Sequence, residues 1–270
     1  MKKIIIVFIC LFYFNFLSSQ SLIDSAYWKI SYRYHWQKDT LTNTIEDDLL
    51  FLQIGKNLSK CYSYYSFQVD SLVVTPNYEK KVWEQFKQAM DTEGYSSPGY
   101  PHKRMRAYVY KNFPYGKMTV TNGFASQDYL YEDELNVQQW SIKDSTKTIL
   151  NYPCQMATSN FRGRQWTAWF APDIPVSDGP WKFGGLPGLI LEVYDRGSQY
   201  HFTAIGLQKV ESEPIIFSET YVGSKKFEKT SRIDFLKAKK RYLINKSGYF
   251  QMETGIDLSG GQPEKIMRYD

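Results

Sequence analysis

The sequence predicts a β-rich α+β protein built on an antiparallel sheet. Segments of alternating apolar and polar residues recur about every ten residues, which is typical of an all-antiparallel arrangement. Aromatic residues make up 17% of the chain, with 22 Tyr and 7 Trp, and such side chains favour half-buried strands. Two further segments have the 3.6-residue apolar period of amphipathic helices.

Residues 1–19 have the composition of a secretory signal peptide. A basic start at 1–3 precedes an apolar run over 4–17, and small residues follow at the expected cleavage point. The run is shorter than the roughly 20 residues that a transmembrane helix needs, and Cys10 lies inside it rather than in a lipid-attachment context. We therefore expect an exported protein of the periplasm, the outer-membrane surface or the extracellular space, without a transmembrane segment in the mature chain.

The mature chain is predicted to form one domain over residues 20–254, followed by a mobile polar tail over 255–270. Loss of the two lysines near the start lowers the formal charge from +5 to +3, so the mature protein is only mildly basic. The first predicted strands are residues 26–36 and a hairpin over 47–69 turned at 55–57. A meander over 104–143, with turns at 115–116 and 122–123, comes next. Two hairpins complete the sheet: 145–161 with 164–172 around 162–163, and 189–195 with 199–210 around 196–198.

Two amphipathic helices are predicted, over residues 78–94 and 231–244. Tyr78, Val82 and Phe86 place an apolar stripe along the first helix. In the second, Ser231 is followed three residues later by Asp234, a pattern that resembles a capping box.

The glycine-rich stretch at residues 177–195 lacks the accessory residues of known ligand loops. A Walker loop needs GxxxxGK[ST], but Leu189 and Ile190 follow the glycines. A dinucleotide loop lies between a strand and a helix, whereas a strand follows here. We expect no cofactor.

Catalytic and metal signatures are also absent from the sequence. The chain has no GxSxG elbow, and His35, His102 and His201 lack partners at metal-ligand spacing. Asp173 and Asp178 are interpreted as turn formers rather than calcium ligands. The sequence leaves open a carboxylate pair assembled only by folding.

Two short basic clusters occur at residues 102–106 and 237–241. We interpret both as solvated faces and expect no nucleic-acid partner, because the protein is exported. Cys61 and Cys154 remain in the mature chain and could form a disulfide in an oxidising compartment.

Residues 162–195 closely resemble the signature block of the GLPGLI family of exported Bacteroidota proteins. The hexapeptide that names this family is intact over Gly185–Ile190, and the upstream residues 173–183 and the context of Cys154 are similar as well. The family is of unknown function, so the resemblance implies membership and export rather than an activity.

The strand layout also resembles the curved half-barrel carriers of the lipoprotein-sorting type. In these carriers a curved antiparallel sheet wraps around helices and encloses an apolar cavity. By this resemblance, the helices at 78–94 and 231–244 would lie on the concave side of the sheet.

The leading functional hypothesis is an exported, non-enzymatic binding or carrier protein for a lipid, a peptide or an envelope protein. The candidate ligand-binding residues, expected at the mouth of the cavity, are Arg164, Trp181, Lys182, Phe183, Leu186 and Pro187. Alternatives are a hydrolase, with Asp173, Asp178 and His201 as first candidates, and an accessory subunit of an outer-membrane transporter.

The glycine-rich stretch itself is interpreted as a structural corner in preference to a binding loop. Gly and Pro set turns and permit positive φ or close chain approach. The residues expected to build this corner are Gly179, Pro180, Gly184, Gly185, Gly188, Leu189 and Ile190.

Overall fold

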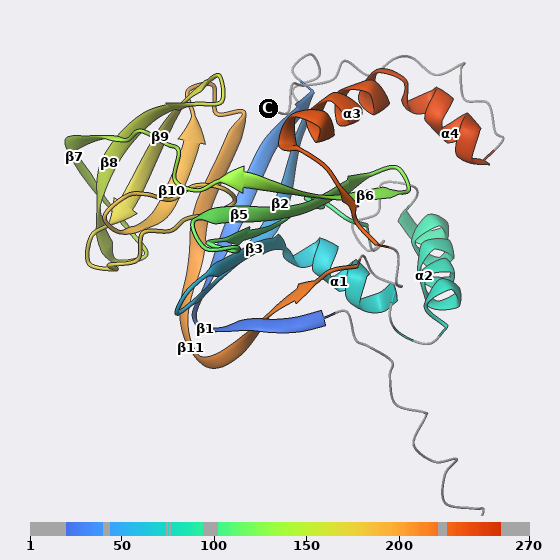
Figure 1. Cartoon of the computed structure of the whole chain (residues 1–270), viewed down its shortest axis with the longest axis horizontal. Helices are drawn as coiled ribbons and strands as arrows, with labels where there is room; N and C mark the ends of the chain where they lie inside the picture. Colours follow the sequence, from blue (N-terminus) through green and yellow to red (C-terminus); the bar gives the residue numbers. More distant parts are fainter. Residues whose placement is uncertain are drawn as a thin grey trace, which may run out of the picture.

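The computed structural model describes residues 20–39, 44–73, 75, 77–93, 102–220 and 226–254. The expected signal peptide and C-terminal tail lie outside these residues. Most of the described chain is strand, which confirms the predicted β-rich class, and one twelve-stranded sheet contains all the strands (Figure 1).

The strands and helices follow one another along the chain with the helices in two groups. The strands are β1 (Gln20–Asp39), β2 (Thr44–Gly55), β3 (Ser59–Ser63), β4 (Tyr108–Lys111), β5 (Lys117–Phe124), β6 (Gln127–Glu134), β7 (Ser141–Ile149), β8 (Tyr152–Phe161), β9 (Arg164–Ala171), β10 (Leu189–Asp195), β11 (Tyr200–Ser218) and β12 (Glu228–Lys229). The helices are α1 (Tyr64–Val73), α2 (Tyr78–Glu93), α3 (Arg232–Ile244) and α4 (Lys246–Thr254).

The sheet is open and mixed. Its strand order is β12-β6-β5-β4-β3-β2-β1-β11-β10-β9-β8-β7, so β12 and β7 form the two edges. All neighbouring strands pair antiparallel except β12, which runs parallel to β6. The antiparallel pairs are mostly hairpin neighbours, as expected from the short turns in the sequence.

The long central strands β1 and β11 bend the sheet. They pair from Gln20↔Ser218 to Trp36↔Tyr200, with three register shifts between these ends. Such bulges bend a strand and increase its twist. Figure 1 shows both strands turning sharply, so that the beginning of β1 and the end of β11 run together below α1.

The two faces of the sheet carry different elements. Cys61 and Tyr62 are adjacent in β3 and therefore point to opposite faces. On the first face, the Sγ atom of Cys61 accepts a hydrogen bond from the Trp181 backbone N–H, 3.2 Å away, in the segment between β9 and β10. On the other face, the Tyr62 ring contacts Phe67 of α1. We call the first the covered face.

The helices divide between these faces. Phe235 of α3 is 2% exposed and packs against Phe124 of β5 and Tyr131 of β6, on the covered face. Ser231 caps α3 as predicted, since its Oγ accepts the Asp234 N–H at 3.1 Å. The predicted helix at 78–94 corresponds to α2, which lies beside α1 (Figure 1).

The prediction that the strand after the first hairpin turn reaches residue 69 was wrong. The strand ends at Ser63, and α1 begins at Tyr64. The reason is a side-chain cap: the Ser63 Oγ accepts the N–H of Ser66 at 3.1 Å, which satisfies a donor in the first turn of a helix.

Three predicted boundaries between residues 122 and 151 were also wrong. Asn122 and Gly123 lie inside β5, paired with β6, rather than in a turn. Residues 137–140 precede β7 and are not part of a strand. The segment predicted as one strand over 145–161 turns at Leu150 and Asn151, both with positive φ. Glycine fits position 123 because a Cβ atom there would lie 2.1 Å from the Asp128 carboxylate and 2.9 Å from the Gln127 carbonyl oxygen, so one of them would have to move.

Candidate functional site

The segment that joins β9 to β10, residues 172–188, lies across the covered face and fills part of it. The Phe183 ring is fully buried against Trp166 and Phe202, with ring centroids 4.7 and 6.0 Å away. Leu186 is likewise 2% exposed. Buried aromatic pairs of this kind hold the segment to the sheet.

A lysine from the sheet fixes the turn within this segment. The Lys111 ammonium on β4 binds the Asp178 carboxylate and donates to the Phe183 carbonyl, 2.8 Å away, and to the Gly179 carbonyl. Gly179 is close to β10, since a Cβ atom there would lie 2.9 Å from the Cβ atom of Ile190. The turn is therefore held by charge, hydrogen bonds and close packing together.

Beyond the turn, Lys182 joins a group of charges around one carboxylate, which we call the Asp133 cluster. Asp133 Oδ2 lies 2.7 Å from Lys182 Nζ and 2.6 Å from the Arg162 guanidinium. Arg232, the first residue of α3, places its Nε 3.8 Å from Asp133 Oδ1. Lys182 Nζ also donates a hydrogen bond to the Tyr131 hydroxyl, 3.3 Å away. Three cations from a hairpin turn, a loop and a helix thus share one carboxylate.

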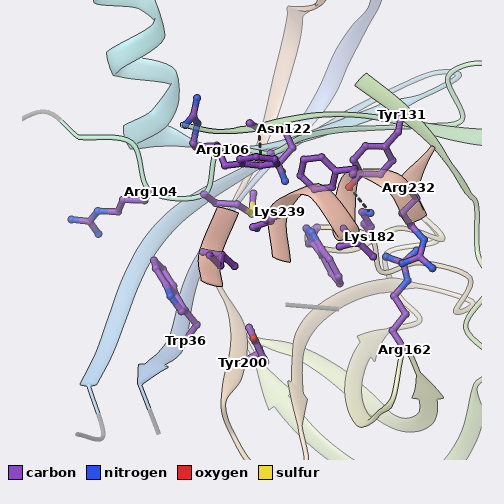
Figure 2. Close-up of a pocket in the computed structure, with 18 of the residues that line it drawn as sticks. Trp36, Arg104, Arg106, Asn122, Tyr131, Arg162, Lys182, Tyr200, Arg232 and Lys239 are labelled. Carbon is purple, nitrogen blue, oxygen red and sulfur yellow. Dashed lines mark hydrogen bonds between the residues drawn. The ribbon is translucent and has the colours of Figure 1, made fainter. Parts of the chain in front are cut away.

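A cavity of about 450 Å³ lies beside this cluster, between α3 and the covered face (Figure 2). We call it the α3 pocket. Its lining residues come from strands β1, β5, β6, β8, β9 and β11, from the segment before β4, the turns after β5 and β8, the 172–188 segment, and helices α3 and α4. They are Tyr34, Trp36, Arg104, Met105, Arg106, Ala107, Asn122, Gly123, Phe124, Ala125, Tyr131, Phe161, Arg162, Arg164, Trp166, Trp181, Lys182, Tyr200, Phe202, Arg232, Phe235, Leu236, Lys239, Tyr242, Leu243 and Lys246.

Aromatic rings make up much of the wall of the α3 pocket. Phe124 stacks on Tyr242 of α3 with ring centroids 5.2 Å apart, and the Phe235 ring lies 5.8 Å from Phe124. On the sheet, Tyr34 stacks on Phe202 at 4.2 Å. These rings give the pocket a rigid apolar surface.

The charged lining residues all carry the same sign. Eight are basic and none is acidic among the described residues that line the pocket. Figure 2 shows Arg162, Lys182 and Arg232 on one side of the pocket and Arg104 and Arg106 towards the other. Arg106 and Arg164 are paired with Asp128 and Asp195, which lie outside the lining. The cations still outnumber these carboxylates, and like charges in a concave, partly apolar site add their potentials, so the lining favours anions.

The pKa values of the pocket lysines reflect this environment. Burial lowers the pKa of Lys182 to about 8, and the Arg162 guanidinium adds to this effect against the opposing attraction of Asp133. Burial also lowers the pKa of Lys239 to about 8, with a further contribution from Arg106. Burial raises the pKa of Asp133, but Lys182 and Arg162 outweigh it and hold that pKa below its ordinary value.

The structure separates the six residues proposed from the sequence as ligand contacts. Trp181, Lys182 and Arg164 line the α3 pocket. Phe183 and Leu186 instead belong to the hydrophobic core, where they are buried. Pro187 is exposed and is not part of the pocket lining.

The residues proposed to form a structural corner occupy the turn and the start of β10. Gly185 has a φ of +82°, which favours glycine, and Gly188 lies so close to the chain that a Cβ atom would be 2.4 Å from the Ala171 carbonyl oxygen. The others, Gly179, Pro180, Gly184, Leu189 and Ile190, are buried.

Sequence reasoning missed most of the cationic lining. The two basic clusters at 102–106 and 237–241 were interpreted as solvated faces, yet Arg104, Arg106 and Lys239 from these clusters line the same pocket. The sequence contained one signal that could have indicated this role: basic and apolar residues alternate over 104–107. Arg232 had no local signal, because its role depends on where α3 docks.

The three residues considered for a hydrolase lie in different environments. Asp178 is bound by Lys111, and Asp173 is exposed in the segment before it. His201 on β11 has its Nε2 atom 2.8 Å from Glu192 Oε1, and Lys147 binds the other oxygen of the same carboxylate, Oε2. The structure therefore does not bring the three candidates into one cleft.

The described residues contain no disulfide, no candidate metal site and no candidate transmembrane helix. Cys61 and Cys154 are both free and buried, so the disulfide considered from the sequence is not present. Within the described residues, no group of three or more His, Cys, Asp or Glu side chains is arranged to hold a metal ion. No helix in the described part of the chain is long and apolar enough to cross a membrane.

Comparisons with known proteins give a family match over one short segment and a similarity of fold to solved structures. A family model described as "Protein of unknown function (Porph_ging)" matches residues 161–192. No curated protein matches the sequence. Similar solved structures include PNGF-II in a C2 crystal form, with 12% identity, a TM-score of 0.50 and coverage of 77% of this chain and 31% of that chain. The P21 form of PNGF-II gives 10% identity, a TM-score of 0.50 and coverage of 78% and 32%.

The chain therefore spans about a third of the length of PNGF-II, and the likeness concerns the fold alone. The matched family segment is more informative about the site. Residues 161–192 include the hexapeptide Gly185–Ile190 and two members of the Asp133 cluster, Arg162 and Lys182. The segment similar to the Porph_ging family is thus the one that covers the sheet and borders the α3 pocket.

Proposed function

We propose that this chain is an exported, non-enzymatic binding or carrier protein of the cell envelope, and that its ligand occupies the α3 pocket. One observation carries the proposal: aromatic rings and eight basic side chains surround a single cavity of about 450 Å³ between α3 and the sheet. Cavities of roughly 300–1,000 Å³ with apolar walls and a few convergent polar groups are typical of small-molecule sites.

Several observations support this proposal without being part of the site. The basic start and short apolar run of residues 1–19 support export. The intact hexapeptide and the Porph_ging match support membership of the GLPGLI family. The bent open sheet and the place of α3 on the covered face support the comparison with half-barrel carriers, whereas α2 lies beside α1 and does not add to it.

The experiment that tests the proposal is native mass spectrometry of the protein isolated from the envelope of its own cells. We expect an added mass that is released by organic solvent. The matched variants are Leu243→Trp, which places a larger side chain in the pocket wall, and Ile244→Trp on the neighbouring residue, which is 70% exposed and outside the lining. Only Leu243→Trp should lose the added mass.

Three results would each contradict part or all of the proposal. The first is a protein that carries no ligand and shows turnover on a panel of hydrolase substrates, which would favour the enzyme hypothesis. The second is recovery of the protein in a stable complex with an outer-membrane transporter that survives Leu243→Trp, which would favour an accessory subunit. Equal retention of ligand by both tryptophan variants would place the binding site elsewhere.

A further inference from the structure

The Asp133 cluster has more positive than negative charge. Lys182, Arg162 and Arg232 all face one carboxylate, at N···O distances of 2.7, 2.6 and 3.8 Å. Their side chains are 4%, 13% and 28% exposed, so water screens this excess only in part. The rings of Phe161, Tyr131 and Trp181 lie near Arg162 or Lys182, but one carboxylate is the only anion that these three cations contact among the described residues, so the cluster favours a second anion.

The geometry shows from which side such an anion would approach. Asp133 is 8% exposed and lies outside the lining of the α3 pocket, whereas all three cations belong to the lining. The carboxylate therefore binds the three cations on the side that faces away from the cavity. The side of the cluster that faces the cavity presents Arg162, Lys182 and Arg232, which Figure 2 shows near one another, together with the neutral Tyr131 hydroxyl.

The remaining wall of the pocket fits an apolar group. Phe124, Phe235 and Tyr242 form a continuous set of ring contacts between β5 and α3. Leu236 and Leu243 of α3 also line the cavity. A ligand that contacts both regions needs one charged end and one apolar body.

We propose that the ligand of the α3 pocket is a small anionic amphiphile, whose carboxylate or phosphate group binds Arg162, Lys182 and Arg232 while its apolar body lies against Phe124, Phe235 and Tyr242. This inference rests on the proposed binding function and adds the chemical class of the ligand. Arginine recognises both oxyanions through paired N–H donors, so the cluster suits either group. The cavity volume of about 450 Å³ favours a small molecule over a polypeptide.

Isothermal titration calorimetry with five probes tests the proposal, with the ionic amphiphiles kept below their micelle-forming concentrations and dodecanol below its solubility limit. The probes are dodecyl phosphate, dodecanoate, dodecanol, dodecyltrimethylammonium and inorganic phosphate. We expect the two anionic amphiphiles to bind at least about 10-fold more tightly than dodecanol or dodecyltrimethylammonium, since hydrogen bonds from cationic side chains to an anion are stronger than those to a neutral hydroxyl. Inorganic phosphate should bind more weakly than dodecyl phosphate, which distinguishes an amphiphile from a free ion.

Two variants of α3 locate the anion. Arg232→Gln removes one cation of the cluster at the first residue of the helix, where a positive charge is unfavourable to the helix dipole, so folding is expected to persist. Lys240→Gln makes the same charge change on an exposed residue outside the lining. Arg232→Gln should weaken dodecyl phosphate binding about 10-fold and leave dodecanol binding unchanged, while Lys240→Gln should change neither.

The outcomes separate this inference from the function on which it rests. Dodecanol binding as tight as dodecyl phosphate would overturn the anionic class and leave the binding function standing. Equal effects of Arg232→Gln and Lys240→Gln would overturn the assignment to the Asp133 cluster. Binding of no amphiphile at all would also overturn the ligand class, whereas the binding function is decided by the native mass spectrometry.

Discussion

Lys111 on β4 holds Asp178 in the segment between β9 and β10, across 67 residues of sequence. The two side chains are 5% and 12% exposed, and the same ammonium also donates to the carbonyls of Gly179 and Phe183. One lysine therefore satisfies a buried carboxylate and two buried carbonyls. Because this segment continues into Lys182, the pair also positions the cationic side of the α3 pocket.

Replacing Lys111 should strongly destabilise the protein. Lys111→Met leaves the Asp178 carboxylate buried without its cation, which costs about 3–5 kcal/mol in the free energy of unfolding. The double variant with Asp178→Asn should recover part of that loss, because it removes the uncompensated charge. Urea denaturation followed by circular dichroism measures both values.

Lys117→Met is the control, since the Lys117–Glu132 pair is 50% and 49% exposed and should contribute less than about 1 kcal/mol. A loss as small for Lys111→Met as for this control would contradict the role assigned to the buried pair.

Asp48 should make stability depend on pH between about 4 and 6. Burial raises its pKa to about 6 from an ordinary value of 3.8, more than the donors Ser63 Oγ and the Met105 N–H lower it. The folded protein therefore binds more protons than the unfolded chain in this window, and the free energy of unfolding falls as the pH rises. The contribution of about two pKa units is on the order of 3 kcal/mol.

Asp48→Asn removes this titration. The stability of the original protein relative to the variant should fall between pH 4 and pH 7, measured by chemical denaturation at several pH values. If the two pH profiles run parallel, Asp48 does not have the raised pKa.

Gly188 should not tolerate a side chain. A Cβ atom at this position would lie 2.4 Å from the Ala171 carbonyl oxygen and 3.0 Å from Pro172, both in the backbone, which has little room to move. We expect Gly188→Ala to lower the free energy of unfolding by about 1–3 kcal/mol. At Gly206 the nearest atom would be 3.7 Å away, so Gly206→Ala is the matched strand control. Similar thermal unfolding of the two variants would contradict the predicted clash.

The thiols of Cys61 and Cys154 should be unreactive in the folded protein. Both are free and buried, and burial raises the pKa of each to about 11. Since the thiolate is the reactive form, a thiol reagent at pH 8 should label neither in native buffer and both after unfolding in guanidinium. Failure of the unfolded, unreduced chain to react would reveal a disulfide, and rapid labelling of the native protein would contradict the burial.

The local features of the chain could be predicted because their causes are local. Alternation predicted β1 and the hairpins at 162–163 and 196–198, since each side chain along a strand takes its face from its own position. Ser231 predicted the start of α3 because its hydroxyl caps a nearby N–H. The error at Ser63 had the same kind of cause, a serine cap that the alternating Tyr residues obscured.

The sequence by itself therefore determined the strand-rich class, the start of α3 and a turn at the glycine-rich segment. Only the tertiary structure brought Arg162, Lys182 and Arg232 around Asp133, because these residues come from a hairpin turn, a loop and a helix that meet only after the sheet has formed. Arg162 and Lys182 are 29 and 49 residues from Asp133, and no periodicity records a contact over that distance. Strand and cap patterns express short-range hydrogen bonding, whereas the charge of the α3 pocket is a property of long-range packing.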